Sequence, residues 1–384
     1  MSNDGGKNFA PTNDNFTSRF TYSVTPDIDK AGRLYATTQN TATSGGFFFT
    51  SEDDGQTWIQ AKGLDIDRVS PFAVLQDRVN PNQLYVGTNL GVFGSVDRGL
   101  NWTHFGEPKP VKKPAAKKKA PAKKGVPAKK PVAAKQAAPT PEAEAGPKLV
   151  PAILEKVKVL THTEDDKNGI IAGTDNGLYR TYDIKKGWEK LPFGEGINEN
   201  VFAVHSSPLT PGTIWVGTAT SGVIVSTDDG RTWSKTEGIP QNVPISSIAS
   251  DPRRPNYIYV GTIHSFYLSR DGGRTWIRRG GNLPLGNYAS ILVHPTNKDE
   301  VFVASALEND GGVFFSNDAG MNWRRVDSKN MVIPSRRVWA MAFDPSDSNR
   351  IFAGSHSSGV YRIERKSAAA GLGDPKPAAI TAGN

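Results

Sequence analysis

An eight-residue phrase recurs along this 384-residue chain, and self-similarity at a fixed period constrains a fold more strongly than local propensity does. The first full copy has Ser51, Asp53, Gly55 and Trp58 in a fixed frame. Four further copies keep this frame and begin at Ser95, Ser226, Ser269 and Ser316. The period predicts a fold built from equivalent units, and we call each copy an octet.

Each octet has the chemistry of a tight turn between two strands. The aspartate can accept backbone N–H groups two residues on, and the glycine can take a positive φ at little steric cost. The tryptophan begins the next strand and offers a large apolar face to bury. A degenerate copy has Thr181 and Trp188 in register but Lys185 in the glycine place. The aspartate recurs in every unit, and the feature that every unit shares is this turn. The octet aspartates are therefore predicted to be structural: Asp4, Asp53, Asp97, Asp183, Asp228, Asp271 and Asp318.

Around each octet the chain repeats a longer pattern of four short strands separated by turn-rich segments. The second strands are predicted at Leu34 to Thr38, Leu84 to Thr88, Ile170 to Thr174, Ile214 to Thr218, Ile258 to Thr262, Val301 to Ser305 and Ile351 to Ser355. The seven units open near Phe20, Phe72, Val157, Val201, Ile245, Ala289 and Val338. The sequence therefore predicts one all-β domain, a seven-bladed β-propeller that spans residues 1–366.

The seventh unit runs into a low-complexity tail, residues 367–384, before any octet appears, and this tail is expected to be disordered. The missing octet stands at the other end of the chain, where Ser2, Asp4, Gly6 and Phe9 keep the frame with Phe in the Trp place. We therefore expect the N-terminal segment to supply the outer strand of the last blade. Such closure pairs the two chain ends, removes free sheet edges and favours a monomer.

The N-terminal octet also bears on where the protein begins. Met1 falls where the third strand of a preceding blade would end, so the chain is expected to be part of a longer protein. The residues given contain no apolar signal segment and no run long enough to cross a membrane. If an export signal lies in missing upstream sequence, an extracytoplasmic location is favoured; otherwise the compartment stays undetermined.

Residues 107–148 are foreign to this pattern and lie between the second and third blades. They include twelve Lys, three Glu and no aromatic residue, so they cannot bury enough apolar surface to fold and are expected to be disordered. Two interpretations stay open: a solvated spacer, or an arm that makes weak, salt-sensitive contacts with polyanions. The chain has no cysteine, which excludes disulfides and thiolate zinc sites, and no metal or cofactor is expected.

The octet resembles the Asp-box, or bacterial neuraminidase repeat, and its seven-unit setting resembles several propeller families. These are the sialidases, the oligoxyloglucan-releasing glycoside hydrolases, the sortilin-type receptor domains and the photosystem II assembly factors. The resemblance implies that the octets lie on a rim away from any ligand. Ligand contacts are then expected on the opposite face, which is formed by the loops after each second strand and by the connections between blades.

One enzyme class implied by this resemblance is the glycoside hydrolases, which usually need two carboxyl groups about 5 to 9.5 Å apart. Asp175 lies in a loop similar to the one that carries a catalytic Asp in the xyloglucan-cleaving enzymes. Glu308 and Asp310, in the longest loop of the predicted ligand face, are candidates for the second carboxylate. An Asp-Asn-Gly sequence is also typical of a tight hairpin, and acidic residues are common in surface loops. Both interpretations of Asp175 remain open.

A sialidase would need three arginines, and Arg68, Arg336 and Arg337 match that number, but the Phe-Arg-Ile-Pro signature of the family is absent from the N-terminus. The interpretation that we favour is a non-catalytic scaffold that binds a protein, peptide or glycan, similar to an exported bacterial assembly factor. A glycoside hydrolase is the alternative. The candidate ligand contacts are Arg68, Asn89, Asp175, His264, Glu308, Arg336, Arg337 and His356.

Overall fold

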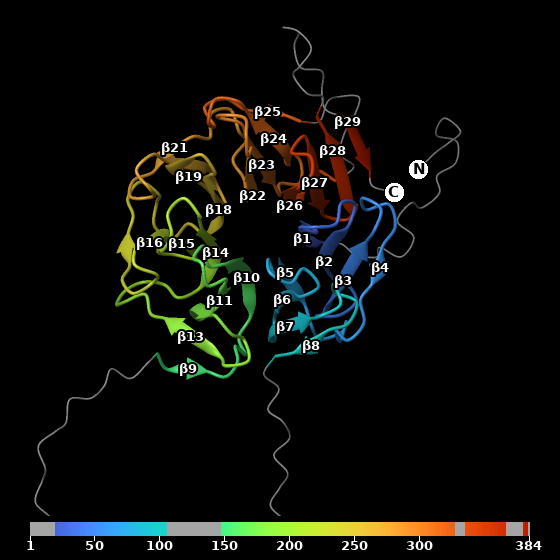
Figure 1. The fold of residues 1–384 in the computed structure, drawn as a ribbon. Helices are drawn as coiled ribbons and strands as arrows, with labels where there is room; N and C mark the ends of the chain where they lie inside the picture. Colours follow the sequence, from blue (N-terminus) through green and yellow to red (C-terminus); the bar gives the residue numbers. More distant parts are fainter. Residues whose placement is uncertain (1–19, 106–146, 327–334, 366–378, 383–384) are drawn as a thin grey trace, which may run out of the picture.

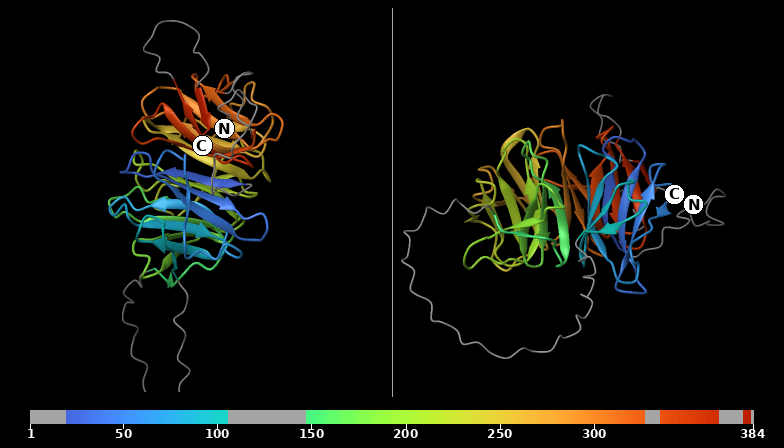
Figure 2. Two further views of the ribbon diagram at one scale, coloured as in Figure 1. Left: turned by 90° about the vertical axis from the view of Figure 1, so that its right-hand side faces the viewer. Right: turned by 60° about the horizontal axis from the view of Figure 1, so that its bottom comes forward.

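The computed structural model describes residues 20–105, 147–326, 335–365 and 379–382. In this part of the chain seven antiparallel sheets stand in a ring, and no residue is helical (Figure 1). The side views show the strands of each sheet running between the two faces of the ring (Figure 2). The predicted seven-bladed β-propeller is therefore confirmed.

Each blade has an inner, a second, a third and an outer strand, paired in that order. The inner strands are β1 (Thr21–Pro26), β5 (Pro71–Gln76), β10 (Val157–His162), β14 (Val201–Ser206), β18 (Ile245–Asp251), β22 (Tyr288–Val293) and β26 (Val338–Phe343). The second strands are β2 (Leu34–Gln39), β6 (Leu84–Thr88), β11 (Ile170–Thr174), β15 (Ile214–Thr218), β19 (Arg254–Thr262), β23 (Val301–Ser305) and β27 (Arg350–Ser355).

The third strands are β3 (Gly46–Ser51), β7 (Gly91–Ser95), β12 (Gly177–Thr181), β16 (Val223–Ser226), β20 (Phe266–Ser269), β24 (Gly312–Ser316) and β28 (Val360–Glu364). The outer strands are β4 (Ile59–Gln60), β8 (Thr103–His104), β13 (Trp188–Leu191), β17 (Ser234–Lys235), β21 (Ile277–Arg278), β25 (Arg324–Arg325) and β29 (Ala379–Ala382). The third blade has a fifth strand, β9 (Leu149–Val150), which pairs with the outer side of β13.

The hydrophobic core lies between neighbouring blades. Four of the second strands, β6, β11, β15 and β23, are buried at every residue because adjacent sheets cover both of their faces. The approach is close enough to require glycine: a Cβ on Gly87 would lie 2.7 Å from the Val157 side chain of the next blade. The same contact joins the last blade to the first, where a Cβ on Gly354 would lie 2.6 Å from Thr21. The ring is thus closed by side-chain packing.

The octets form turns of one geometry on the face opposite the second-to-third-strand loops. In the first copy the Ser51 hydroxyl donates to the Asp53 carboxylate at 2.8 Å and accepts the Gly55 amide at 2.9 Å. Asp53 accepts the backbone amide and the hydroxyl of Thr57, four residues on rather than the expected two. Gly55 has a φ of +83°, as expected for this turn, and the buried Trp58 donates its indole N–H to the Gly55 carbonyl. The hydroxyl contacts recur at Ser95, Ser226, Ser269 and Ser316.

The predicted closure by an N-terminal strand is not confirmed. The outer position of the seventh blade is taken by β29, which pairs with β28 through Ile363 and Ile380, while Ser2 to Phe9 lie outside the described residues. β29 also falls inside the tail for which disorder was expected. The physical reason is that a sheet edge offers main-chain hydrogen bonds, so any short segment that can become extended beside it can complete the ladder. Most of the lysine-rich insert, residues 106–146, also lies outside the described part of the chain.

Candidate functional site

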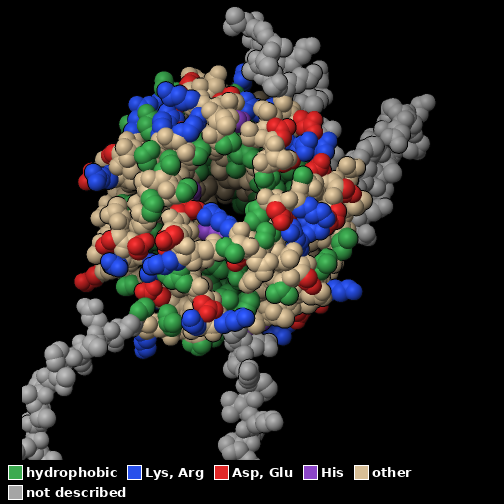
Figure 3. Space-filling model, viewed as in Figure 1, with side chains coloured by type: hydrophobic (Ala, Val, Ile, Leu, Met, Phe, Trp, Pro, Cys, Tyr) green, Lys and Arg blue, Asp and Glu red, His purple; other side chains and the backbone are tan. Residues whose placement is uncertain are grey.

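The loops that follow the second strands share one face of the ring with the connections between blades, and we call it the loop face. Each inner strand begins at this face and each third strand ends at the opposite face, where an octet follows in the first six blades. The face of the ring seen in Figure 3 is hollowed at its centre, with charged side chains at the edge of the hollow. The loop face is where the predicted ligand residues lie.

Four of the predicted residues line one cavity of about 450 Å³ between the sixth and seventh blades. Glu308 comes from the β23–β24 loop, Arg336 and Arg337 precede β26, and His356 comes from the β27–β28 loop. Asn309, Ser335, Ser357 and Ser358 complete the lining. We call this site the arginine cavity.

Its charged side chains are held in place by their neighbours. Arg337 donates to the Glu308 carboxylate at 2.9 Å, and the Arg337 side chain is 33% exposed whereas that of Glu308 is 75% exposed. Arg336 donates to the backbone carbonyl of Asn309. The His356 ring bonds to the Ser357 hydroxyl. Among the described residues, the cavity lining therefore has two guanidinium groups and one carboxylate, which is already paired.

The candidate catalytic carboxylates are not brought together in this cavity. Asp175 belongs to the third blade, Glu308 and Asp310 belong to the sixth, and Asp175 does not line the arginine cavity. The Asp175 carboxylate instead forms an ion pair with Lys158 at 2.6 Å. Burial lowers the pKa of Lys158, while this ion pair opposes the shift. The loop itself is a structural turn, in which the Thr174 hydroxyl donates to the Gly177 carbonyl at 3.0 Å.

The remaining predicted residues lie around other blades. Arg68 is exposed in the connection before the second blade, and its carbonyl accepts the Asn89 side-chain amide at 2.8 Å. Asn89 also accepts the Ser70 amide at 2.7 Å, so it braces this connection. His264 is exposed in the β19–β20 loop. The three arginines whose number matches that of a sialidase are not all in the arginine cavity, because Arg68 does not line it.

The sequence analysis missed a ring of residues at the start of the inner strands. In all seven blades the first residue of the inner strand is buried, the second is partly exposed, and the pairing with the second strand shifts register between the first and third residues. Such a bulge re-aims the side chain that it carries. These second residues, which we call the ring mouth, are Tyr22, Phe72, Lys158, Phe202, Ser246, Ala289 and Trp339. The sequence signal that could have revealed the ring mouth is an aromatic residue directly after the first, buried residue of an inner strand.

The aromatic residues of the ring mouth contact one another across blade boundaries. The Tyr22 and Phe72 ring centroids are 5.2 Å apart with their planes at 68°. Phe20 stacks on Tyr22 at 6.4 Å and meets the edge of Trp339 at 6.1 Å. Phe20 also lies 4.2 Å from the His356 ring, in an edge-to-face contact. Phe20 therefore connects the ring mouth directly to the arginine cavity.

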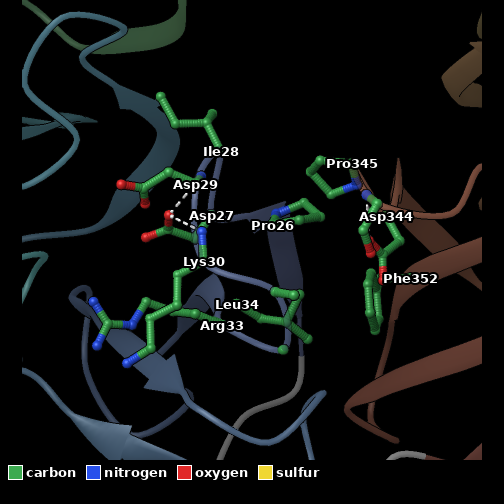
Figure 4. Close-up of a pocket in the computed structure, with 13 residues that line it drawn as sticks. Pro26, Asp27, Ile28, Asp29, Lys30, Arg33, Leu34, Asp344, Pro345 and Phe352 are labelled. Carbon is green, nitrogen blue, oxygen red and sulfur yellow. Dashed lines mark hydrogen bonds between the residues drawn. The ribbon is translucent and has the colours of Figure 1, made fainter.

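A second pocket, of about 190 Å³, lies on the opposite face between the first and seventh blades (Figure 4). Its buried Asp27 accepts the amides of Asp29 and Lys30, and also accepts hydrogen bonds from the Tyr35 hydroxyl and the Arg98 guanidinium. Burial alone would raise the pKa of Asp27, but these hydrogen bonds hold it well below its usual range. All of these polar groups serve the turn between β1 and β2, so we assign this pocket a structural role.

Two further features are not found among the described residues. No three His, Asp or Glu side chains among them are grouped as metal ligands. None of the described segments is a helix suited to crossing a bilayer.

No family model matches the chain. Among curated proteins, it is 32% identical over 144 residues to the oligoxyloglucan-reducing end-specific xyloglucanase of Emericella nidulans, a match covering 35% of this chain and 17% of that protein. The xyloglucanase of Hypocrea jecorina is 30% identical over 116 residues, which are 30% of this chain and 13% of that protein. The chain thus spans less than a fifth of the length of these relatives.

Similar solved structures cover nearly all of the chain. An ancestral GH74 enzyme superposes with a TM-score of 0.65 at 17% identity, covering 91% of this chain and 45% of that one. YCF48 bound to D1 peptide superposes with a TM-score of 0.56 at 15% identity, covering 90% of this chain and 93% of that one. YCF48 from Cyanidioschyzon merolae gives 0.57 at 12% identity, with 90% and 94% covered. At such identities the likeness shows the propeller fold and not a shared activity.

Proposed function

We propose that this chain is a non-catalytic propeller that binds an extended segment of another protein on its loop face. The observation that carries the proposal is the arginine cavity, in which Arg336 and Arg337 outnumber the one carboxylate, Glu308. Arginine is enriched where proteins recognise one another, because its planar guanidinium makes several directed hydrogen bonds. A glycosidase site would instead present two carboxyl groups facing each other across a bound sugar.

The match to YCF48 supports a protein ligand over a glycan. The superposition with YCF48 covers about nine tenths of this chain and about nine tenths of YCF48. One of the YCF48 structures holds a D1 peptide. The GH74 enzyme is matched over less than half of its length. A rigid ring whose loops can vary without disturbing the core suits a binding role. The role of an exported assembly factor, the monomeric state and weak polyanion binding by residues 107–148 remain predictions.

The test is selection of a random dodecapeptide library displayed on phage against the whole chain. The dissociation constants of the enriched peptides are then measured by calorimetry. We expect the double variant Arg336→Ala/Arg337→Ala to weaken binding by about tenfold or more, which corresponds to about 1.4 kcal/mol. The matched control is Arg231→Ala/Arg274→Ala, which removes two exposed arginines from the octet face. Failure to enrich any peptide, or equal binding by both double variants, would count against the proposal.

A glycoside hydrolase is the second candidate, because the chain is locally similar in sequence to xyloglucanases and carries the Asp-Asn-Gly loop at Asp175. The Asp175 carboxylate lies 2.6 Å from the Lys158 ammonium. The decisive measurement is the release of new reducing ends from xyloglucan oligosaccharides. We expect no release from the native chain. Release that disappears in Asp175→Asn would establish the enzyme.

A further inference from the structure

We infer that the ring mouth is a socket for a large apolar side chain of the bound segment, and that acidic residues elsewhere in the same segment pair with Lys156. This inference rests on the proposed function and specifies the chemistry of the ligand. The socket is formed by side chains of different blades, so the folded ring is needed to assemble it.

The ring mouth has a gap. Aromatic side chains occupy it on the seventh, first, second and fourth blades, but the fifth and sixth blades contribute only Ser246 and Ala289. The gap is therefore flanked by Phe202 on one side and Trp339 on the other. Phe202 is 40% exposed, and Trp339 is partly exposed. Exposed aromatic surface of this kind, gathered in one place, marks an interaction site.

The gap lies beside the arginine cavity. Ala289 is on the sixth blade, whose β23–β24 loop supplies Glu308 to that cavity, and Trp339 follows Arg336 and Arg337 at the start of β26. Phe20 touches both Trp339 of the mouth and His356 of the cavity. An extended chain held in the cavity can thus place one side chain in the gap.

Two lysines make this aromatic surface unsuited to stacking a sugar. The Lys156 ammonium lies over the Phe72 ring at 4.4 Å from its centroid, and the Lys158 ammonium lies over Phe202 at 3.9 Å. The Tyr22 ring meets Phe72 with the planes at 68°, which turns an edge rather than a second face toward that ring. A sugar needs a free, flat ring face, whereas an inserted side chain needs only apolar walls. The contacts therefore favour a peptide.

The two lysines differ in whether a carboxylate is paired with them. Lys158 is paired with Asp175 at 2.6 Å. Among the described residues Lys156 makes no such ion pair, and its ammonium is held by the Phe72 ring alone. Lys156 is partly buried, and at the lower effective dielectric of such a site a carboxylate is attracted to an ammonium more strongly than in bulk water. An acidic residue of the bound segment would supply that carboxylate.

The test uses three acetylated and amidated synthetic pentapeptides and the whole chain. The first is Glu-Glu-Phe-Glu-Glu; the second has alanine in place of phenylalanine; the third has lysine in place of every glutamate. Binding is measured by calorimetry, with the change in tryptophan fluorescence as a second readout. We expect the first peptide to bind at least tenfold more tightly than either of the others. Equal affinities for the first and second peptides would overturn the inference.

Two variants locate the binding. Ala289→Trp fills the gap and is expected to abolish binding of the first peptide, and Lys156→Glu is expected to weaken it at least tenfold. Lys185→Glu, which reverses the charge of an exposed lysine on the octet face, is the matched control and should bind like the native chain. Thermal unfolding of each variant checks that the ring is intact. Unchanged binding by a folded Ala289→Trp variant would also overturn the inference.

The outcome separates this inference from the proposal on which it rests. If the phage-selected peptides depend on Arg336 and Arg337 but bind Ala289→Trp and Lys156→Glu normally, the socket is wrong and the binding function stands. If a xyloglucan heptasaccharide binds the native chain and Ala289→Trp removes that binding, the mouth is a glycan site and the inference is likewise wrong.

Discussion

At the scale of single residues, the octet aspartates are turn-formers held by short hydrogen bonds. In the third full copy Asp228 accepts the Thr232 hydroxyl at 2.6 Å, the Thr232 amide at 2.9 Å and the Ser226 hydroxyl at 2.7 Å. The hydrogen bonds from Thr232 and Ser226 lower the pKa of Asp228 to about 2, from an ordinary value of 3.8. These contacts stabilise the turn between β16 and β17.

The first residue-scale prediction is that Asp228→Ala lowers the free energy of unfolding by about 1 to 2 kcal/mol, because four hydrogen bonds to an ionised group, including one from the Arg231 amide, are lost at a partly exposed site. The effect should depend on pH. Since the folded pKa lies below the unfolded one, the contribution of Asp228 is complete above about pH 4 and is lost as the pH falls through about 2.

Urea denaturation of the native chain and the variant between pH 2 and pH 7 checks this prediction, with Thr227→Ala, a change at an exposed neighbour, as the control. The difference between native and Asp228→Ala curves should shrink on acidification. A difference that grows toward pH 2, or one that Thr227→Ala reproduces, would show that the hydrogen bonds have a different role.

At the scale of elements, the seventh blade differs from the other six because its outer strand comes from the end of the chain. β29 pairs with β28 over four residue pairs, from Tyr361 with Ala382 to Glu364 with Ala379. No octet joins these two strands, since residues 366–378 stand between them. A main-chain ladder of four residue pairs holds β29 at this sheet edge.

We predict that Ile380→Pro releases β29, because proline has no N–H to donate and is poorly tolerated within a ladder. Amide hydrogen exchange measured by mass spectrometry should show faster exchange in Val360–Glu364, the β28 segment that β29 covers. Exchange in the inner strand β26 should stay slow, since β27 and the neighbouring blades protect it. Unchanged protection of β28 would mean that another segment, such as Ser2 to Phe9, can occupy the edge.

At the scale of the whole molecule, ion pairs between neighbouring blades join the ring around its circumference. Arg98 of the second blade pairs with Asp27 and Asp29 of the first, each at 2.7 Å. Arg362 of the seventh blade reaches Asp54 of the first at 3.1 Å, across 308 residues of sequence. Such pairs supplement the apolar packing between blades, and those with a buried partner are the most consequential.

Arg98→Ala is predicted to destabilise the ring by about 2 to 4 kcal/mol, because the buried Asp27 carboxylate loses its cation. The Tyr35 hydroxyl and two backbone amides still donate hydrogen bonds to Asp27 in this variant. The expected loss of stability therefore stays below the upper end of the range for removing one partner of a buried ion pair. The measurement is the urea denaturation curve, with Arg68→Ala as the control, since Arg68 is exposed. Equal stability of the two variants would contradict the prediction.

The architecture was predictable because the period of the octets is a property of the sequence alone. The predicted second strands Leu84 to Thr88, Ile170 to Thr174, Ile214 to Thr218 and Val301 to Ser305 coincide with β6, β11, β15 and β23. Alternating apolar residues and turn residues determine strands and turns within a few positions, so these elements can be predicted from short stretches of sequence. β29 was not predictable, because its partner lies on another segment and its own residues carry no octet.

The sequence by itself determined the number of blades, the octet turns and the face on which Arg336, Arg337, Glu308 and His356 would lie, since each follows from local pattern and repeat order. Only the tertiary structure decided that these four share a cavity and that Asp175 faces Lys158 instead of a second carboxylate. The ring mouth was likewise decided by the fold. Its members stand one per blade along the chain, so packing of neighbouring blades brings Tyr22 to Phe72, and closure of the ring brings Phe20, beside the mouth, to Trp339.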